Sequence, residues 1–428
     1  MLIRKQKPQS GFLPADISQP SAFKKIKKND APHVTNTKLL RNINKTRSRI
    51  KNIYIMKMKT LALTILISTL GMTSCSGANK TTTDNHLTTV TEPTDKDDVE
   101  KTLKFSNFDG IKSDVDIEIH YAQDAKYSVK VSAPQDLLDN TDISMNGSTI
   151  TLKAKDGNRQ SHPNIIMDNG QIYYLNGDAN SKIKMYVTAP QIRMLNNDGG
   201  GMEFYAVHMD NDELAINTTG LFKMNVQSIK CTGENGMSVS NTGSFTAEVP
   251  TVDAKQLSLD NTGALLFNGK SINGSLHIDN SGQTTFSGDV KGADFTLDNS
   301  GMCKLSSTFV LTNEYSFDNS GLASGDGDIT AKTINISSSG QEQRNGAFKA
   351  DRMSIDISGN SKYQISFTGG DVFLDCSGVG NFNLALDCRS IDVDSGGFID
   401  VTLSGTADKT SFEGSGSSHL NTSKLNKF

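Results

Sequence analysis

The sequence lacks tryptophan, and aromatic residues make up only 7% of its 428 residues. Hydrophobic residues reach 35%, which is low for a chain of this length built around one compact core. The 37 glycines show no triplet period, so a collagen-like fibre is excluded. The apolar residues are nevertheless too regularly placed for a disordered chain. This composition favours a repeat protein, in which each unit buries a thin apolar strip against its neighbours.

Basic residues are scarce outside the first part of the chain. Residues 1–74 contain fifteen Lys and Arg against two Asp, a charge of +13, so the remaining residues must carry −17 to give the overall −4. A surface of that sign repels the phosphates of nucleic acids and anionic lipids. We therefore expect no nucleic-acid partner.

An export segment follows an N-terminal stretch without any pattern. Residues 56–74 contain a short basic start, the apolar run 61–70 and small residues before Cys75. The run is too short to span a bilayer, so it predicts a signal peptide. Because it ends at a cysteine, it resembles the lipoprotein type of Bacteroidota, which implies acylation of Cys75; the alternative is an ordinary signal peptide with a chance cysteine. Residues 1–55 are interpreted as a mis-annotated N-terminal extension rather than a cytoplasmic tail.

The mature chain is predicted to begin with a flexible tether, residues 75–102, which is rich in Thr, Asp and Asn. Residues 103–189 alternate apolar and polar side chains, as half-buried strands do, and Asn146-Gly147 predicts a hairpin turn between two of them. A polar insertion interrupts this region near 157–181. We interpret 103–189 as an N-terminal β cap, and we find no helical periodicity in any segment.

Residues 190–420 form a repeat, and from Gly263 on its period is 19 residues, with one step of 20. Each unit has two apolar positions, then a motif such as Asp-Asn-Ser-Gly, and another apolar position four residues beyond the glycine. The glycines that mark the predicted structural turns are Gly263, Gly282, Gly301, Gly321, Gly340, Gly359, Gly378 and Gly397. A fixed period of this length indicates a solenoid of about twelve units.

The repeat is too short to hold a helix beside its two strands. It predicts an all-β fold, a right-handed parallel β-helix in which each unit forms one coil. The second apolar column runs through aromatic residues such as Phe267 and Phe286 and is interrupted at Gly325 and Arg344. The cysteines within the coils lie in different coils or on opposite walls, so we expect them to be unpaired.

The opening Phe108-Asp-Gly-Ile-Lys112, the strands up to residue 156 and the run 184–190 resemble the head GIN domain family of auto-transporter adhesins of Bacteroidota. The resemblance covers residues 103–420 and implies an N-terminal β cap, a β-helix and an adhesive role. The turns of that family are usually Gly-Ser-Gly, whereas Asn-Ser-Gly replaces most of them here. Asn also tolerates a left-handed backbone, so we expect the same turns.

An acidic column precedes the turn glycines by three residues and includes Asp279, Asp298 and Asp318. Stacked at the strand spacing, these carboxylates form a candidate site for divalent cations. Alternatively, each Asp accepts a hydrogen bond from its own turn, which we favour. The companion column, Asn261, Asn280, Asn299 and Asn319, falls on the apolar side and predicts a ladder of amide hydrogen bonds.

Residue patterns typical of catalysis are missing. The seven histidines share no phase in the repeat, no nucleophile motif is recognisable and zinc-type spacing is absent. Pectate-lyase-like β-helix enzymes need an Arg or Lys base beside acids. The best candidate for such a cleft is the polar segment 341–346 around Arg344, for which we favour a tolerated irregular coil. We therefore predict no catalytic residues and no cofactor.

Together these features predict a lipid-anchored, outer-membrane lipoprotein of the cell envelope, either periplasmic or surface-exposed. Its expected role is an adhesin or a scaffolding surface, with the membrane as one partner and envelope proteins, host proteins, glycans or further copies of itself as others. The alternative is a polysaccharide-binding or polysaccharide-active β-helix.

The substitution Cys75→Ala tests the anchor. Without the acylated thiol the chain should move from the membrane fraction to the soluble fraction, because two or more acyl chains hold a protein firmly to a bilayer. Cell fractionation followed by immunoblotting measures this, with a serine outside the export segment, Ser76→Ala, as the matched control. A Cys75→Ala protein that stays with the membrane contradicts the lipoprotein interpretation.

Overall fold

The computed structural model describes residues 98–155, 165–168, 171–174 and 182–427, all of which belong to one compact unit, Thr91–Phe428. The predicted extension 1–55, the signal peptide 56–74, Cys75, most of the tether and most of the insertion lie outside the described residues. No helix in the described part of the chain is long and apolar enough to cross a membrane.

The N-terminal region contains both antiparallel and parallel strands. Its elements are β1 (Asp98–Leu103), β2 (Gly110–Ser113), β3 (Ile117–Gln123), β4 (Ser128–Pro134), α2 (Gln135–Asp139), β5 (Thr141–Asn146), β6 (Thr149–Ala154), β7 (Ile165–Asp168), β8 (Gln171–Tyr174) and β9 (Ile183–Ala189). Strands β1, β4 and β9 pair antiparallel, whereas β2 and β3 pair parallel with β10 and β11 of the solenoid. The solenoid ladder therefore starts within the region predicted as a cap.

This region contains a hairpin that the sequence predicted and a short helix that it did not. The hairpin at Asn146-Gly147 is confirmed, because β5 and β6 pair antiparallel around it and Gly147 has a φ of 60°. The five-residue helix α2 was not predicted. It follows Pro134, whose ring presets the backbone for a turn, and it is too short to give a helical period.

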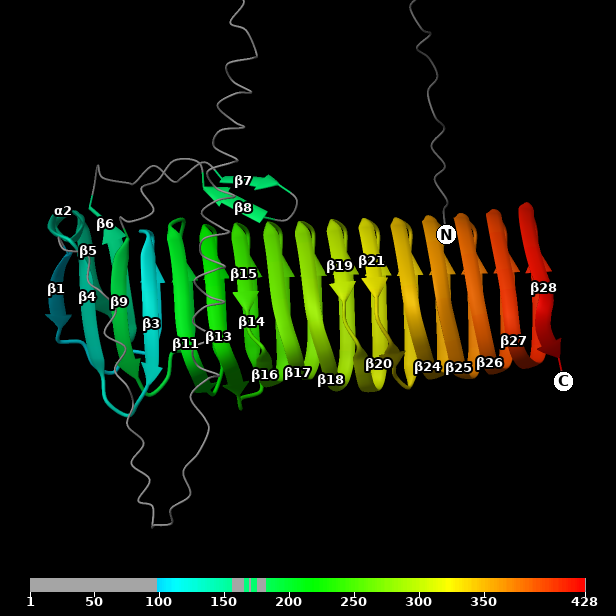
Figure 1. Ribbon diagram of the computed structural model, residues 1–428, viewed down its shortest axis with the longest axis horizontal. Helices are drawn as coiled ribbons and strands as arrows, with labels where there is room; N and C mark the ends of the chain where they lie inside the picture. Colours follow the sequence, from blue (N-terminus) through cyan, green and yellow to red (C-terminus); the bar gives the residue numbers. More distant parts are fainter. Residues whose placement is uncertain (1–97, 156–164, 169–170, 175–181, 428) are drawn as a thin grey trace, which may run out of the picture. The chain divides into compact units, whose positions relative to one another are not determined.

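The remaining strands wind into a parallel solenoid of about twelve coils, seen side-on in Figure 1. They are β10 (Met194–Asn197), β11 (Gly201–Asn211), β12 (Leu214–Thr218), β13 (Leu221–Cys231), β14 (Met237–Asn241), β15 (Ser244–Glu248), β16 (Thr251–Asn261), β17 (Ala264–Asn280), β18 (Gln283–Asn299), β19 (Met302–Ser306), β20 (Phe309–Asn319), β21 (Leu322–Asp326), β22 (Ile329–Thr330), β23 (Thr333–Ser338), β24 (Gln341–Ile357), β25 (Asn360–Cys376), β26 (Val379–Ser395), β27 (Phe398–Gly414) and β28 (Ser417–Lys427). The predicted parallel β-helix is thereby confirmed.

The core is a stack of identical positions from successive coils. Leu257, Leu276, Phe295 and Tyr315 lie opposite one another, as the 19-residue period requires. The second column stacks aromatic rings, with centroids 5.5 Å apart for Phe267 and Phe286. The four cysteines of the coils are buried and unpaired, which confirms that expectation: Cys231, Cys303, Cys376 and Cys388.

The turn glycines are required by close approach between coils. A Cβ atom on Gly282 would lie 2.1 Å from the carbonyl oxygen of Gly263, and one on Gly301 would meet the oxygen of Gly282 at the same distance. Among the described residues, neither the eight predicted turn glycines nor the asparagines two residues before them adopt a left-handed φ. The expectation of left-handed turns was therefore wrong: the constraint is the space between neighbouring backbones.

The asparagine column forms the predicted amide ladder inside the corner. Each Nδ2 donates to the Oδ1 of the next coil, from Asn241 to Asn261 at 2.7 Å, on to Asn280 at 2.8 Å, to Asn299 at 2.6 Å and to Asn319 at 2.7 Å. The same Nδ2 atoms also donate to backbone carbonyls, such as that of Met302, 2.9 Å from Asn280. The ladder thus links successive coils through buried side-chain hydrogen bonds, in addition to the backbone pairing of the strands.

We expect Asn280→Ala to lower the free energy of unfolding by about 3 kcal/mol, because it removes several buried hydrogen bonds and leaves their partners unsatisfied. The control is Asn383→Ala, at an exposed position on β26, which should change stability by less than about 0.5 kcal/mol. Chemical denaturation measures both. Equal effects of the two substitutions would contradict a stabilising ladder.

Candidate functional site

The acidic column lies in register along one outer corner. Asp260, Asp279, Asp298 and Asp318 pair in successive coils, and after Ser337 the column continues through Asp356, Asp375, Asp394 and Glu413. All of these carboxylates are exposed, and in the described part of the chain none makes a hydrogen bond or ion pair. The expectation that each Asp bonds its own turn is therefore wrong.

The turn hydrogen bonds come from the next residue instead. The backbone N–H of Gly321 donates to Oδ1 of Asn319 at 3.1 Å, and that of Gly243 donates to Asn241 at the same distance. Because side chains alternate along a strand, the asparagine faces the corner interior while the preceding Asp faces solvent. Among the described residues, no group of three or more His, Cys, Asp or Glu is arranged to hold a metal ion. The candidates Asp279, Asp298 and Asp318 therefore carry no metal proposal.

The pKa of Asp375 in the column lies above its ordinary value of 3.8. Partial burial is the largest cause, and the neighbouring carboxylates of Asp356 and Asp394 add to it. The folded chain therefore disfavours ionisation at this position.

The segment around Arg344 is a buried cluster and does not form an open cleft. The Arg344 side chain is 3% exposed, and its Nε donates to Glu342 Oε1 at 2.7 Å. Its Nη1 donates to the Tyr315 hydroxyl at 2.9 Å, and its guanidinium lies 3.6 Å from the centroid of the Phe317 ring. Burial raises the pKa of Tyr315 to about 12. The cluster is shut off from solvent, so Arg344 cannot serve as a catalytic base here.

Gly325 and Arg344, which both interrupt the apolar column, compensate each other. They are neighbours in register, and a Cβ on Gly325 would lie 2.2 Å from Nη1 of Arg344. The missing side chain of one coil therefore provides the space for the guanidinium of the next.

A second outer surface, over β9, β3 and β11, gathers ionic and aromatic side chains that the sequence analysis did not single out. Lys182 Nζ lies 2.6 Å from Glu118 Oε2 and 2.7 Å from Glu203 Oε1. The ring of His120 stacks with those of Tyr186 and Tyr205 at centroid distances of 5.1 and 5.4 Å. In the segments 117–121 and 183–187 every second residue is apolar and buried, so the residues between them must face outward. That alternation could have identified this surface from the sequence.

The carboxylates of this surface are held in the ionised form. Burial alone would raise the pKa of Glu118, but hydrogen bonds from Lys182 and His120 outweigh it and lower the pKa. Burial acts in the same way on Glu203, and Lys182 and Tyr205 reverse it. A general acid needs a raised carboxyl pKa, so this network is suited to binding or to stability and not to acid catalysis.

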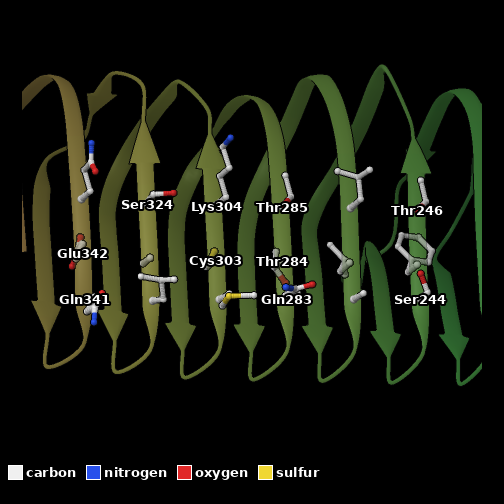
Figure 2. A pocket seen from close by; sticks show the side chains of 18 of the residues that line it. Ser244, Thr246, Gln283, Thr284, Thr285, Cys303, Lys304, Ser324, Gln341 and Glu342 are labelled. Atoms are coloured by element: carbon white, nitrogen blue, oxygen red, sulfur yellow. The ribbon is translucent and has the colours of Figure 1, made fainter. Parts of the chain in front are cut away.

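A groove of about 660 Å³ runs along the outer face of the coils from β15 to β25. Figure 2 shows its side chains in rows, with Thr246, Thr285, Lys304 and Ser324 in one row and Ser244, Gln283 and Gln341 in another. The residues between the rows, such as Thr284, Cys303 and Glu342, are buried and face the core. The groove therefore follows the solenoid axis, at right angles to its strands.

The outward side chains of the groove are available to a ligand. Gln283, Gln341, Gln343 and Asn360 are exposed, and in the described part of the chain their amides make no hydrogen bond. Lys304 and Lys362 are likewise exposed and form no ion pair there, and Met302 and Leu322 add exposed apolar surface, 41% and 47% exposed. Chemically, this surface can donate and accept many hydrogen bonds but has no poised acid, base or nucleophile.

The fold and these surfaces define a β-solenoid whose outer faces are suited to binding. Residues 107–310 match the family model described as "Putative auto-transporter adhesin, head GIN domain". The predicted resemblance to the head GIN domain family is confirmed over those residues. Similarity to this adhesin-like family suggests a location at the cell envelope or cell surface.

Similar solved structures include a putative adhesin from Bacteroides fragilis, with 14% identity, 76% of this chain and 98% of the other covered, and a TM-score of 0.26. A putative adhesin from Parabacteroides merdae has 14% identity, 77% and 97% coverage and a TM-score of 0.25. A putative lipid binding protein from Parabacteroides distasonis has 14% identity, 78% and 98% coverage and a TM-score of 0.22. No curated protein matches the sequence. The family assignment therefore rests on residues 107–310.

We expect Asp375→Asn to raise the free energy of unfolding at pH 7 by up to about 1 kcal/mol, because it removes a repelled charge from the exposed column. When folding raises the pKa of a carboxyl, ionising that carboxyl lowers the stability of the folded state. Below the ordinary pKa of 3.8 the group is protonated in both states and stability is unaffected. The loss of stability grows as the pH rises through 3.8 and the raised value. The gain should therefore vanish near pH 3.

Thermal unfolding between pH 3 and pH 7 measures this effect. Asp253→Asn is the matched control, since Asp253 is exposed and its neighbours in register are Lys230 and Asn273, neither of them acidic. A gain that persists at pH 3, or an equal gain in the control, would contradict repulsion within the column.

Proposed function

We propose that this chain is a lipid-anchored protein of the cell envelope that acts as an adhesin-like binding surface and does not catalyse a reaction. The observation that carries the proposal is the groove from β15 to β25, whose hydrogen-bonding side chains are directed outward and have no partner in the described part of the chain. Ligand sites are typically concave and contain polar groups that fix the ligand's orientation, and outward donors and acceptors without partners in a groove can serve that role.

The ionisable groups support a binding role. The buried Arg344 is paired with Glu342, and Glu118 and Glu203 are both kept ionised by Lys182. Cleavage of a polysaccharide requires an acid and a base with separated pKa values beside a substrate groove. The groove contains no outward carboxylate or histidine among its lining residues. Of the two forms of the alternative function, polysaccharide binding is therefore favoured over polysaccharide cleavage.

The anchor follows from the export segment. An acylated Cys75 joined to a polar tether would hold the solenoid near the membrane while leaving its faces accessible. We infer an outer-membrane lipoprotein, and exposure to the outside of the cell is the orientation that an adhesive role requires.

The proposal predicts that a bacterium lacking this protein attaches less to an epithelial monolayer or to a lawn of its own strain. Attachment should return with the parent chain and not with Ser324→Trp, which fills the middle of the groove. The matched control is Thr330→Trp, at an exposed position on β22 outside the groove, which should restore attachment. Counting attached cells measures the effect.

Proteinase K treatment of intact cells tests the orientation in the same strains. Digestion of the parent chain on intact cells agrees with surface exposure, whereas protection until the outer membrane is opened contradicts it. Unchanged attachment of the deletion strain to both surfaces would overturn the adhesive role.

A further inference from the structure

We infer that the groove from β15 to β25 binds a linear, anionic polysaccharide laid along the solenoid axis. The inference rests on the proposed function and specifies the ligand of the same surface. Its starting point is the length of the groove, which spans the seven coils from Ser244 to Asn360. At roughly 4.8 Å per coil this is about 29 Å, which is long enough for several sugar units in a row.

The lining suits a ligand rich in hydroxyl groups. The side chains that face outward are mainly amides and hydroxyls, which both donate and accept hydrogen bonds: Thr246, Gln283, Thr285, Ser324, Gln341, Gln343 and Asn360. Because equivalent positions lie opposite one another in successive coils, outward side chains recur at the strand spacing, and most of them are amides, hydroxyls or lysines. A repeating surface matches a repeating polymer better than it matches a small molecule.

An extended peptide is a poorer occupant. Peptides that add to sheets pair with free backbone N–H and C=O groups at an edge strand. Here each groove strand between the first and last coils is flanked by parallel neighbours on both sides, as β19 is by β18 and β21. Recognition must therefore come from side chains, which removes the main source of affinity for a peptide strand.

The charge of the groove favours an anionic glycan over a neutral one. Lys304 and Lys362 lie in the same row, separated by Ser324 and Gln343, so they are three coils or about 14 Å apart. No carboxylate is directed outward from the lining, since the only acidic residue in it, Glu342, is buried against Arg344. The residues after 74 carry a net charge of −17. Two unpaired lysines in a groove without outward carboxylates therefore favour an anionic ligand at this position.

Apolar contact is available in the middle of the groove. Met302 and Leu322 are neighbours in register and are both partly exposed. The C–H faces of sugar rings pack on such surfaces, and the absence of aromatic rings among the outward side chains predicts weak binding per sugar. Affinity should then increase with chain length, because each added unit makes further contacts.

The experiment measures binding of the purified full-length chain, kept in detergent, to immobilised polysaccharides by biolayer interferometry. The probes are polygalacturonate, which carries carboxylates, chondroitin sulfate, which also carries sulfates, dextran, which is neutral, and polyglutamate as an anionic peptide. We expect both anionic glycans to bind, dextran to bind at least about tenfold more weakly, and high salt to weaken the binding.

The double variant Lys304→Gln/Lys362→Gln should weaken binding of the anionic glycans about tenfold, as expected for the loss of two charge-assisted contacts. The matched control is Lys291→Gln/Lys349→Gln. These lysines are exposed, unpaired in the described part of the chain and also three coils apart, but they lie in another row, outside the groove. The control should bind as the parent does. Ser324→Trp, which keeps the charge, should also weaken binding.

Several results would overturn the inference. Equal weakening by both double variants would show a general charge effect, and equal binding of dextran or polyglutamate would exclude an anionic-glycan site. If no probe binds but cells carrying the parent chain still attach and Ser324→Trp cells do not, the ligand class is wrong and the proposed function stands. If attachment is also independent of the protein, both fail.

Discussion

The whole solenoid depends on how closely successive coils approach at one corner. The carbonyl oxygen of each turn glycine lies close to the turn glycine of the following coil. A Cβ atom added to Gly282, for example, would lie only 2.1 Å from the carbonyl oxygen of Gly263. Only glycine fits there, and the backbones of neighbouring coils bond directly, as the N–H of Gln283 does to the carbonyl oxygen of Gly263. From Asn241 to Asn319, the asparagine two residues before the turn glycine donates to a backbone carbonyl of the next coil, and Asn241, Asn261, Asn280 and Asn299 also bond their counterparts one coil away. The close contact between glycine backbones and the asparagine hydrogen bonds thus act together to fix the spacing of successive coils at this corner.

The amide ladder ends towards the C-terminal half of the solenoid, whereas the close approach of the turn glycines continues. The last asparagine of the ladder, Asn319, donates to Ser338 at 3.0 Å, and the following coils place Ile357 and Cys376 in the same column. The glycine column nevertheless continues, with Gly359 and Gly378 in equally close contact with the coil before them. Close approach is therefore needed in every coil, whereas the amide ladder can give way to apolar packing once the column is buried.

Because the corner and the two inward columns specify the fold, the outward side chains are free to vary. That freedom explains why a long row of repelling carboxylates, broken only at Ser337, and a groove lined by amides, hydroxyls and two lysines occur on one molecule. The carboxylates cost little in water, where exposed charges are well screened. The groove places its polar groups where no neighbour within the described chain engages them. The paired network of Lys182, Glu118 and Glu203 is the contrasting case, in which ionic groups are used within the molecule.

The sequence by itself determined the solenoid, its period and the amide ladder, because a 19-residue repeat of inward apolar residues permits few other arrangements. It also indicated that the coil cysteines are unpaired and which family the chain resembles. It could not decide that Asp298 makes no bond to its own turn or why the turns need glycine, since both depend on how the corners of neighbouring coils pack. Only the tertiary structure showed that Gly325 makes room for Arg344, and that Gln283, Lys304 and Gln343 share one groove. Residues separated by one or more coils become neighbours through strand register, and register is a property of the folded stack.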